Sequence, residues 1–192
     1  GYTAALCVIE LKKKGNPKDG KVIVTGASGG VGSIAVNLLS ELGYYVVALS
    51  NKQKQFLFSL GAKEVLSRDE FKPNVKPLGN QTWIGCIDTV GGDILASVIS
   101  EIKYDGIAVA TGLAKSHLLN TTVYPFILRN VTLSGVDCVY ASSAKRRKAW
   151  NLIEKKLNFR KLKLIKSEKN ISDINDLSKK IIEGKIKGRT LI

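Results

Sequence analysis

A glycine-rich turn near the start of the chain most constrains what this sequence can fold into. The turn reads Gly26-Ala27-Ser28-Gly29-Gly30-Val31-Gly32, with an apolar run before it and apolar residues at helical spacing after it. A strand, glycine turn and helix in this order present backbone N–H groups and the positive end of a helix dipole to a phosphate. Side chains would block that approach, which is why glycine is needed. The sequence therefore predicts a site for the pyrophosphate of a dinucleotide, the alternative being a tight strand–helix connection without a ligand.

The end of the second predicted strand, 45–49, distinguishes between the common dinucleotides. An acidic residue at this place accepts hydrogen bonds from the ribose of NAD and repels a 2′-phosphate. This chain has Ser50, Asn51 and Lys52 instead, with Lys54 beyond them. A hydroxyl and an ammonium group suit a phosphate, so we expect NADP(H). The alternative is that the two lysines are merely solvated.

Short apolar strands alternate with helical segments along most of the chain. We expect strands near 22–24, 45–49, 64–66, 84–90, 106–110 and 131–136, and helices near 2–14, 31–42, 51–60, 92–102, 124–129 and 142–157. Ser50 stands where the N-cap of the third helix is expected. In the tail we expect a strand near 161–165, a helix near 173–183 and a strand near 189–192. This alternation predicts an α/β fold, a doubly wound Rossmann domain with a six-stranded parallel sheet.

The composition adds a strong positive charge to this picture. The formal net charge is +14, from 30 basic and 16 acidic residues. Much of it comes in lysine runs on the polar faces of predicted helices, where simple solvation is one interpretation and a phosphate-rich ligand or nucleic acid is another. No RNA-binding motif or aromatic platform accompanies the basic clusters, so a nucleic-acid-binding module is the less favoured alternative.

Cysteine usage favours a cytoplasmic protein, whereas the expectation of no metal rests on the family resemblance given below. Cys7, Cys86 and Cys138 have no metal-ligand spacing, so we expect three reduced thiols. The single histidine, His117, lies in a predicted loop and is expected to be solvated. No apolar run approaches the roughly 18 residues that a membrane span needs, so we expect no membrane segment.

One other enzyme class that shares the glycine turn is excluded by its missing catalytic pair. Short-chain dehydrogenases need a tyrosine followed four residues later by a lysine that lowers the pKa of the tyrosine. None of the six tyrosines in this chain has a lysine at that position.

Several motifs point to another family. They are Gly1-Tyr2-Thr3-Ala4, Val24 to Ser33, Ser59 to Ala62, Arg68 to Phe71, Ile87 to Gly91, Thr122 to Val131, Gly135-Val136-Asp137 and Gly188-Arg189-Thr190. With these motifs the sequence resembles the medium-chain dehydrogenase/reductase superfamily, in its zinc-independent quinone-oxidoreductase branch and near the bacterial acrylyl-CoA reductase group. The stretch from Thr122 to Asp137 is more specific than the glycine turn.

The resemblance also implies cofactor contacts. It places Ser28, Gly29, Gly30 and Val31 around the pyrophosphate, Ser50, Asn51 and Lys52 at the adenosine phosphate, Arg68 near the adenosine end, Leu113 and Ile127 beside the nicotinamide half, and Arg189 as a further contact from the tail. Relatives more often carry arginine at the position of Lys52, so this contact would be a single point charge. Leu113 also follows the end of a predicted strand, where such sheets bind ligands. Ile127 would otherwise be an ordinary core residue.

The resemblance further implies that a GroES-like domain precedes Gly1 and carries the catalytic residues, which cannot be named from this chain. We therefore expect an NADP(H)-binding domain over 1–157, with its linking helix, and a return segment of the catalytic domain over 158–192. The activity implied is NADPH-dependent reduction of the C=C bond of an α,β-unsaturated thioester such as acrylyl-CoA, with a quinone or enone reductase as the alternative. This chain alone is expected to be inactive, and its sixth strand is expected to pair across a homodimer.

Overall fold

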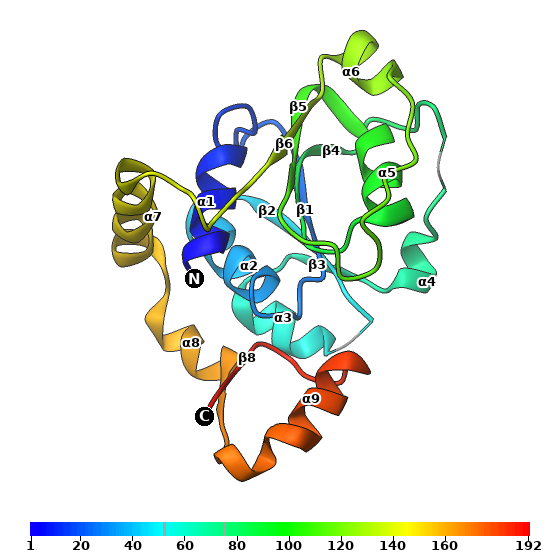
Figure 1. Cartoon of the computed structure of the whole chain (residues 1–192). Coiled ribbons are helices and arrows are strands. Elements are labelled where there is room, and N and C mark those ends of the chain that lie inside the picture. Colours follow the sequence, from blue (N-terminus) through cyan, green and yellow to red (C-terminus); the bar gives the residue numbers. More distant parts are fainter. Residues whose placement is uncertain (52, 75) are drawn as a thin grey trace.

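A six-stranded parallel sheet forms the centre of the computed structural model, which describes residues 1–51, 53–74 and 76–192 (Figure 1). Its strands are β1 (Lys21–Thr25), β2 (Tyr45–Leu49), β3 (Glu64–Leu66), β4 (Trp83–Asp88), β5 (Ile102–Ala110) and β6 (Thr132–Gly135). They lie in the order β3-β2-β1-β4-β5-β6, and every neighbouring pair is parallel. This is the strand order of a Rossmann domain, in which the order reverses between β1 and β4. The predicted fold class is confirmed.

Helices cover both faces of the sheet because alternate strand residues point to opposite sides. On one face, Val22 and Val46 belong to a core shared with α1 (Tyr2–Leu11), α2 (Gly32–Glu41), α3 (Lys54–Leu60) and α7 (Ser143–Lys156). On the other face, Ile23 and Val47 belong to a core dominated by α5 (Gly92–Ser100). The short helices α4 (Arg68–Phe71) and α6 (Tyr124–Arg129) lie at the edges of this second core, to which each contributes one phenylalanine.

The region after β2 differs from the prediction that Ser50 is a helix N-cap. The N–H group of Ser50 donates to the carbonyl oxygen of Leu66 (2.9 Å), which continues the pairing of β2 with β3 beyond the strand ends. The helix begins only at Lys54, after Gln53 in a left-handed conformation (φ 56°). Backbone pairing therefore takes precedence over capping, and the side chain of Ser50 lies at the end of the sheet.

The tail also contains one wrong prediction. The strand expected near 161–165 is part of a helix, α8 (Phe159–Ile165), and the strand that follows is β7 (Lys166–Glu168). The alternation of lysine and leucine over 161–164 is typical of a strand, but Leu162 and Ile165 are the pair that packs inward, at helical spacing. Leu164 is instead 45% exposed.

The remaining tail forms a small unit beside the main sheet. A 3₁₀ turn (Ile171–Asp173) leads into α9 (Ile174–Ile182), and β8 (Arg189–Leu191) pairs in parallel with β7. Figure 1 shows this unit next to α3, at the end of the sheet where α2 begins. The segment before it is tied to α2, because Asn158 exchanges hydrogen bonds with Asn37 and Lys161 pairs with Glu41 (2.9 Å). The boundary at 157/158 stays a prediction.

The described cysteines are free thiols, and no described helix is long and apolar enough to cross a membrane. Cys7 and Cys86 are buried, whereas Cys138 is partly exposed. Burial raises the pKa of Cys7 to about 12, so this thiol stays protonated at neutral pH.

A buried carboxylate joins the carboxyl ends of β1 and β4. The carboxylate of Asp88, which is fully buried, accepts hydrogen bonds from the hydroxyl of Thr25 (2.5 Å) and the N–H groups of Gly91 (2.8 Å) and Val90 (3.3 Å). Thr89 completes the link, because its N–H group donates to the hydroxyl of Thr25 and its own hydroxyl donates to the carbonyl oxygen of Thr25. Burial raises the pKa of Asp88, and the hydrogen bonds it accepts oppose that shift. The network fixes the two loops that follow these strands.

Replacing this carboxylate tests how much the network stabilises the fold. Asp88→Ala leaves three donors without an acceptor, so we expect the free energy of unfolding to fall by about 3 kcal/mol. The matched control is Asp93→Ala, an exposed acid five residues later, for which we expect a loss below about 1 kcal/mol. Urea denaturation followed by circular dichroism measures both. Equal losses for the two variants would contradict the role given to Asp88.

Candidate dinucleotide site

The glycine turn is a tight backbone structure that begins α2. Gly26 has a left-handed conformation (φ 59°), and its carbonyl oxygen accepts from the N–H group of Gly29 (3.0 Å). A side chain at Gly32 would meet the carbonyl oxygen of Gly26 and lie 2.8 Å from the Cα atom of Ala27. Glycine is therefore required at Gly32 for α2 to start so close to β1. Among the described residues, no side chain caps α2 at Val31, although the N–H group of Ser33 donates to the carbonyl oxygen of Gly29 (3.0 Å). A helix start without a side-chain cap is suited to an anion.

A cavity of about 240 Å³ lies next to this turn. Its walls come from the turn, the end of β2, the start of α5 and the tail: they are Gly26, Ser28, Leu49, Ser50, Asn51, Val90, Ile94, Glu183 and Gly184. The hydroxyl of Ser50 donates to the hydroxyl of Ser28 (2.9 Å), so the two loops present polar atoms at one place. We call this space the adenosine-side cavity, because it adjoins the end of β2.

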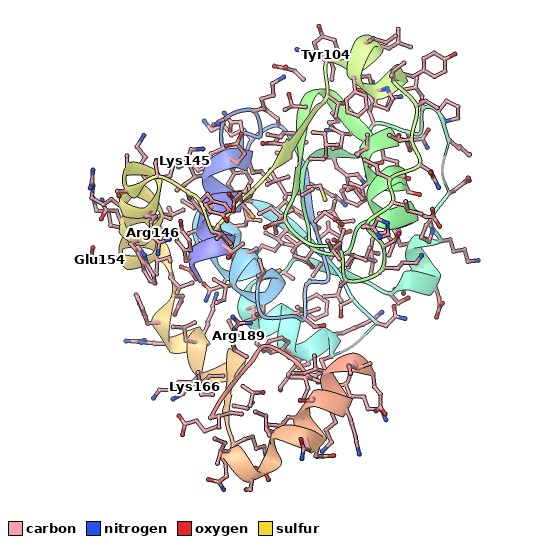
Figure 2. The ribbon with its side chains drawn as sticks, viewed as in Figure 1. Tyr104, Lys145, Arg146, Glu154, Lys166 and Arg189 are labelled. Atoms are coloured by element: carbon pink, nitrogen blue, oxygen red, sulfur yellow. The ribbon has the colours of Figure 1, made fainter. Side chains whose placement is uncertain are left out.

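The tail reaches back and lies directly on the glycine turn. The N–H group of Gly188 donates to the carbonyl oxygen of Ser28 (2.8 Å). A Cβ atom on Gly30 would stand 2.9 Å from Cδ of Arg189, so the arginine side chain uses the space that this glycine leaves open. Figure 2 labels Arg189 on β8, next to α3 and close to α2. A guanidinium group at this point is suited to a pyrophosphate.

A second, wider cavity of about 760 Å³ lies at the carboxyl ends of β5 and β6. Leu113, which is 66% exposed, lines it together with His117 and Asp137. Consecutive residues of α5 line the two cavities, Ile94 the first and Leu95 the second. Both cavities lie along the carboxyl ends of the strands, which is where ligands bind in open α/β sheets, and we call them together the cofactor groove.

Most of the residues predicted for the site lie on this groove. Ser28, Ser50 and Asn51 line the adenosine-side cavity, and Leu113 lines the second cavity. Gly29, Gly30 and Val31 follow Ser28 in the glycine turn, and Arg189 lies against Gly30. Lys52 lies outside the described residues. Arg68 begins α4 directly after β3, at the same end of the sheet, and the structure describes its backbone only. Whether these residues contact a cofactor stays a prediction.

Ile127 lies away from the groove of this chain, and its expected contact with the nicotinamide half stays a prediction. It lies on α6, whose Arg129 donates to the carbonyl oxygens of Ser100 (2.9 Å) and Gly79 (2.7 Å). The carbonyl of Ser100 stands just before β5 and that of Gly79 shortly before β4, and α6 itself leads into β6, so α6 lies at the amino ends of these strands. Ile127 is 68% exposed there, so it is neither beside this chain's own groove nor in its core.

Two wall residues of the groove, Glu183 and Gly184, were not found from the sequence. They come just after α9, more than 130 positions from Ser50 along the chain. Locally, the glycine indicates only the end of a helix. No spacing pattern connects it with the glycine turn, because the contact depends on how the tail folds back.

No cluster of three or more histidine, cysteine, aspartate or glutamate side chains that could hold a metal is present in the described part of the chain.

Comparison with known proteins gives close matches over the whole chain. A protein of Escherichia coli named as a probable acrylyl-CoA reductase AcuI is 47% identical over all of this chain and 60% of its own length. The acrylyl-CoA reductase AcuI of Ruegeria pomeroyi is 41% identical over all of this chain and 59% of its own length. YhfP of Bacillus subtilis, named as a quinone oxidoreductase, is 40% identical over all of this chain and 60% of its own length. The chain therefore spans about 60% of the length of these relatives.

Solved structures agree with the fold. The crystal structure of Escherichia coli YhdH with bound NADPH has a TM-score of 0.95 and 46% identity, covering 99% of this chain and 59% of that protein. Bacillus subtilis YhfP with bound NAD has a TM-score of 0.91, with the same coverage.

A family match completes the comparison. The family described as zinc-binding dehydrogenase matches residues 30–155, which is more than half of the chain and includes α2, the strands from β2 to β6 and nearly all of α7. The chain therefore belongs to the zinc-binding dehydrogenase family, and its resemblance to medium-chain dehydrogenases/reductases is confirmed.

Proposed function

We propose that this chain is the cofactor-binding part of an NADPH-dependent oxidoreductase that reduces the C=C bond of an α,β-unsaturated thioester such as acrylyl-CoA. The observation that carries the proposal is the 47% identity to an acrylyl-CoA reductase along the whole chain. The groove at the carboxyl ends of the strands supports it, because it has the shape and polar groups that a dinucleotide needs.

The residues around the adenosine-side cavity fit NADP(H). The N–H groups at the start of α2 have no side-chain cap, and the lack of a side chain at Gly30 lets Arg189 pack against the glycine turn. These N–H groups and Arg189 would hold the pyrophosphate. Ser50 and Asn51 stand where a 2′-phosphate would lie, and no acid occupies the end of β2. Glu183, from the tail, is a carboxylate in the same cavity, and it is paired with Lys185 (2.7 Å).

The second cavity would accommodate the nicotinamide end and the reacting part of the substrate. When bound, the reduced nicotinamide supplies the hydride for the reaction. The chain's own contribution is to orient the ring, with Leu113 as an apolar wall, and to keep the cavity beside the ends of β5 and β6. The groups that stabilise negative charge on the thioester oxygen are proposed to lie on a preceding domain.

Two further expectations remain proposals. The edge strand β6 has no partner strand on its outer side within the described chain, and we propose that it pairs with a second copy in a homodimer. We also keep the division into a cofactor domain over 1–157 and a return segment over 158–192.

The substrate class is tested by comparing two electron acceptors. The protein carrying this chain and its preceding domain is assayed for NADPH oxidation with acrylyl-CoA and with a quinone. We expect kcat/KM to be at least about a hundredfold higher for the thioester, because an enzyme site discriminates through transition-state contacts that a quinone lacks. Equal kcat/KM values, or a higher value for the quinone, would contradict the thioester proposal. They would favour a quinone reductase, the activity for which YhfP is named.

Cofactor preference is tested at the end of β2. Ser50→Asp places a carboxylate where the 2′-phosphate is proposed, so we expect the affinity for NADPH to fall at least about tenfold while NADH binding is unchanged or tighter. Ser59→Asp adds the same charge at an exposed position of α3 and serves as the control. Fluorescence titration of the chain with each cofactor measures both. A parallel loss of NADPH and NADH affinity would contradict the assigned role of Ser50.

The role of Arg189 predicts a different pattern. The pyrophosphate is common to both dinucleotides, so Arg189→Gln should weaken NADPH and NADH equally, by about tenfold, and leave their ratio unchanged. Arg189→Lys should recover part of the loss, because it restores the charge without the planar fork. The control is Arg160→Gln on α8, which is exposed. If Arg189→Gln binds both cofactors like the unchanged chain, the proposed contact does not exist.

A further inference from the structure

A groove lined by lysines lies between α1, α7 and the segment that follows β6. It has a volume of about 570 Å³, and Lys13 of α1 and Lys145 and Lys148 of α7 line it. Leu6 and Val136 give it an apolar floor. Figure 2 shows Lys145 in the first turn of α7, on the side of that helix nearest α1. We call this feature the lysine groove.

The acidic residues of the lysine groove are already engaged. Glu10 pairs with Lys13 (2.6 Å) and accepts a hydrogen bond from Ser134 (3.0 Å). Although burial opposes its ionisation, these hydrogen bonds and the charges of Lys13 and Lys145 hold the pKa of Glu10 below its usual value. Asp137 accepts from the N–H groups of the two residues that follow Cys138.

Two ammonium groups are left to face the lysine groove. In the described part of the chain, no carboxylate lies within salt-bridge distance of Lys145 or Lys148. The two residues are three positions apart, so they lie on one face of α7. Their charges are therefore available to an anionic ligand, and their aliphatic stems extend the apolar floor.

The lysine groove is continuous with the second cavity of the cofactor groove. Gly135, Val136 and Asp137 line both of them. These residues end β6 and begin the long segment that crosses to α7 (Figure 1). A ligand with its reacting end in the second cavity can thus continue over the end of β6 and reach the lysines.

We propose that the lysine groove binds the phosphate groups of the coenzyme A moiety of the substrate. The inference rests on the proposed function, and it adds the subsite that would recognise the part of the thioester remote from the reacting bond. A CoA thioester has an uncharged, flexible arm that suits the apolar floor and a nucleotide end with several phosphates that suits the lysines. Tyr140, which is 89% exposed on the rim, presents an aromatic face on which the adenine ring can stack.

Binding to the chain itself tests the subsite. NADP⁺ is added to saturation first, so that coenzyme A cannot occupy the cofactor cavity, and coenzyme A and pantetheine are then titrated by calorimetry. In the double variant Lys145→Gln/Lys148→Gln we expect coenzyme A to bind about tenfold more weakly, because two charge-assisted contacts are lost. Pantetheine has no phosphate on which these lysines could act, so its binding should not change.

A matched control lies on the same helix. Lys155→Gln/Lys156→Gln removes the same charge from the exposed last turn of α7, which does not line the lysine groove. We expect this variant to bind coenzyme A within about twofold of the unchanged chain, since only long-range attraction is reduced. Equal weakening by both double variants would overturn the subsite, because it would show a general charge effect. Unchanged binding in Lys145→Gln/Lys148→Gln would overturn it as well.

Kinetics separates this inference from the proposed function. In the protein with its preceding domain, Lys145→Gln/Lys148→Gln should raise KM for acrylyl-CoA about tenfold and leave kcat nearly unchanged, because contacts remote from the reacting bond affect mainly binding. The acrylyl thioester of pantetheine should be reduced equally well by both proteins. If the double variant reduces acrylyl-CoA with an unchanged KM, the proposed subsite is contradicted and the proposed function is not. If the unchanged protein reduces neither thioester, the proposed function is contradicted, whatever the binding experiment shows.

Discussion

The site depends on the close approach of Gly32, at the start of α2, to the backbone of Gly26 and Ala27. No side chain fits between them, so α2 can begin close to the end of β1, without a side-chain cap on its first turn. The buried carboxylate of Asp88 fixes the adjacent strand end at the same level, through Thr25. Together, these two contacts determine where β1 and β4 separate, and a ligand binding at the reversal of strand order depends on that geometry.

The tail completes the groove from the other end of the chain. Gly188 donates a hydrogen bond to the turn, and Arg189 occupies the space above Gly30. A dinucleotide held between the turn and the tail would therefore contact residues more than 150 positions apart in the sequence. A ligand that contacts both would stabilise the docked tail, because binding to the folded state stabilises whatever the ligand contacts.

The sequence predicted the parts of this structure that local patterns determine. The second and third strands, 45–49 and 64–66, have the predicted bounds, and the glycine turn lies at the strand–helix junction as expected. The prediction for 161–165 was wrong because lysine–leucine alternation fits a strand as well as a helix, and only the packing of Leu162 and Ile165 on α2 and α3 decides. Ile127 was placed by resemblance alone, without a pattern showing at which end of the sheet α6 lies. Glu183 joins the groove through a fold-back that no local spacing encodes.

The positive charge of the chain acquires a more specific meaning from where the lysines lie. A net charge of +14 attracts any anion, so by itself it cannot distinguish a cofactor from a substrate or from nucleic acid. The adenosine-side cavity has the hydroxyls of Ser28 and Ser50 in its walls and Arg189 on the adjoining glycine turn, whereas the lysine groove offers ammonium groups on an apolar floor. Directional donors suit a ligand that must be held in one orientation for the reaction. Flexible lysines suit the remote phosphates of a substrate that must also leave, since point charges attract without fixing a geometry.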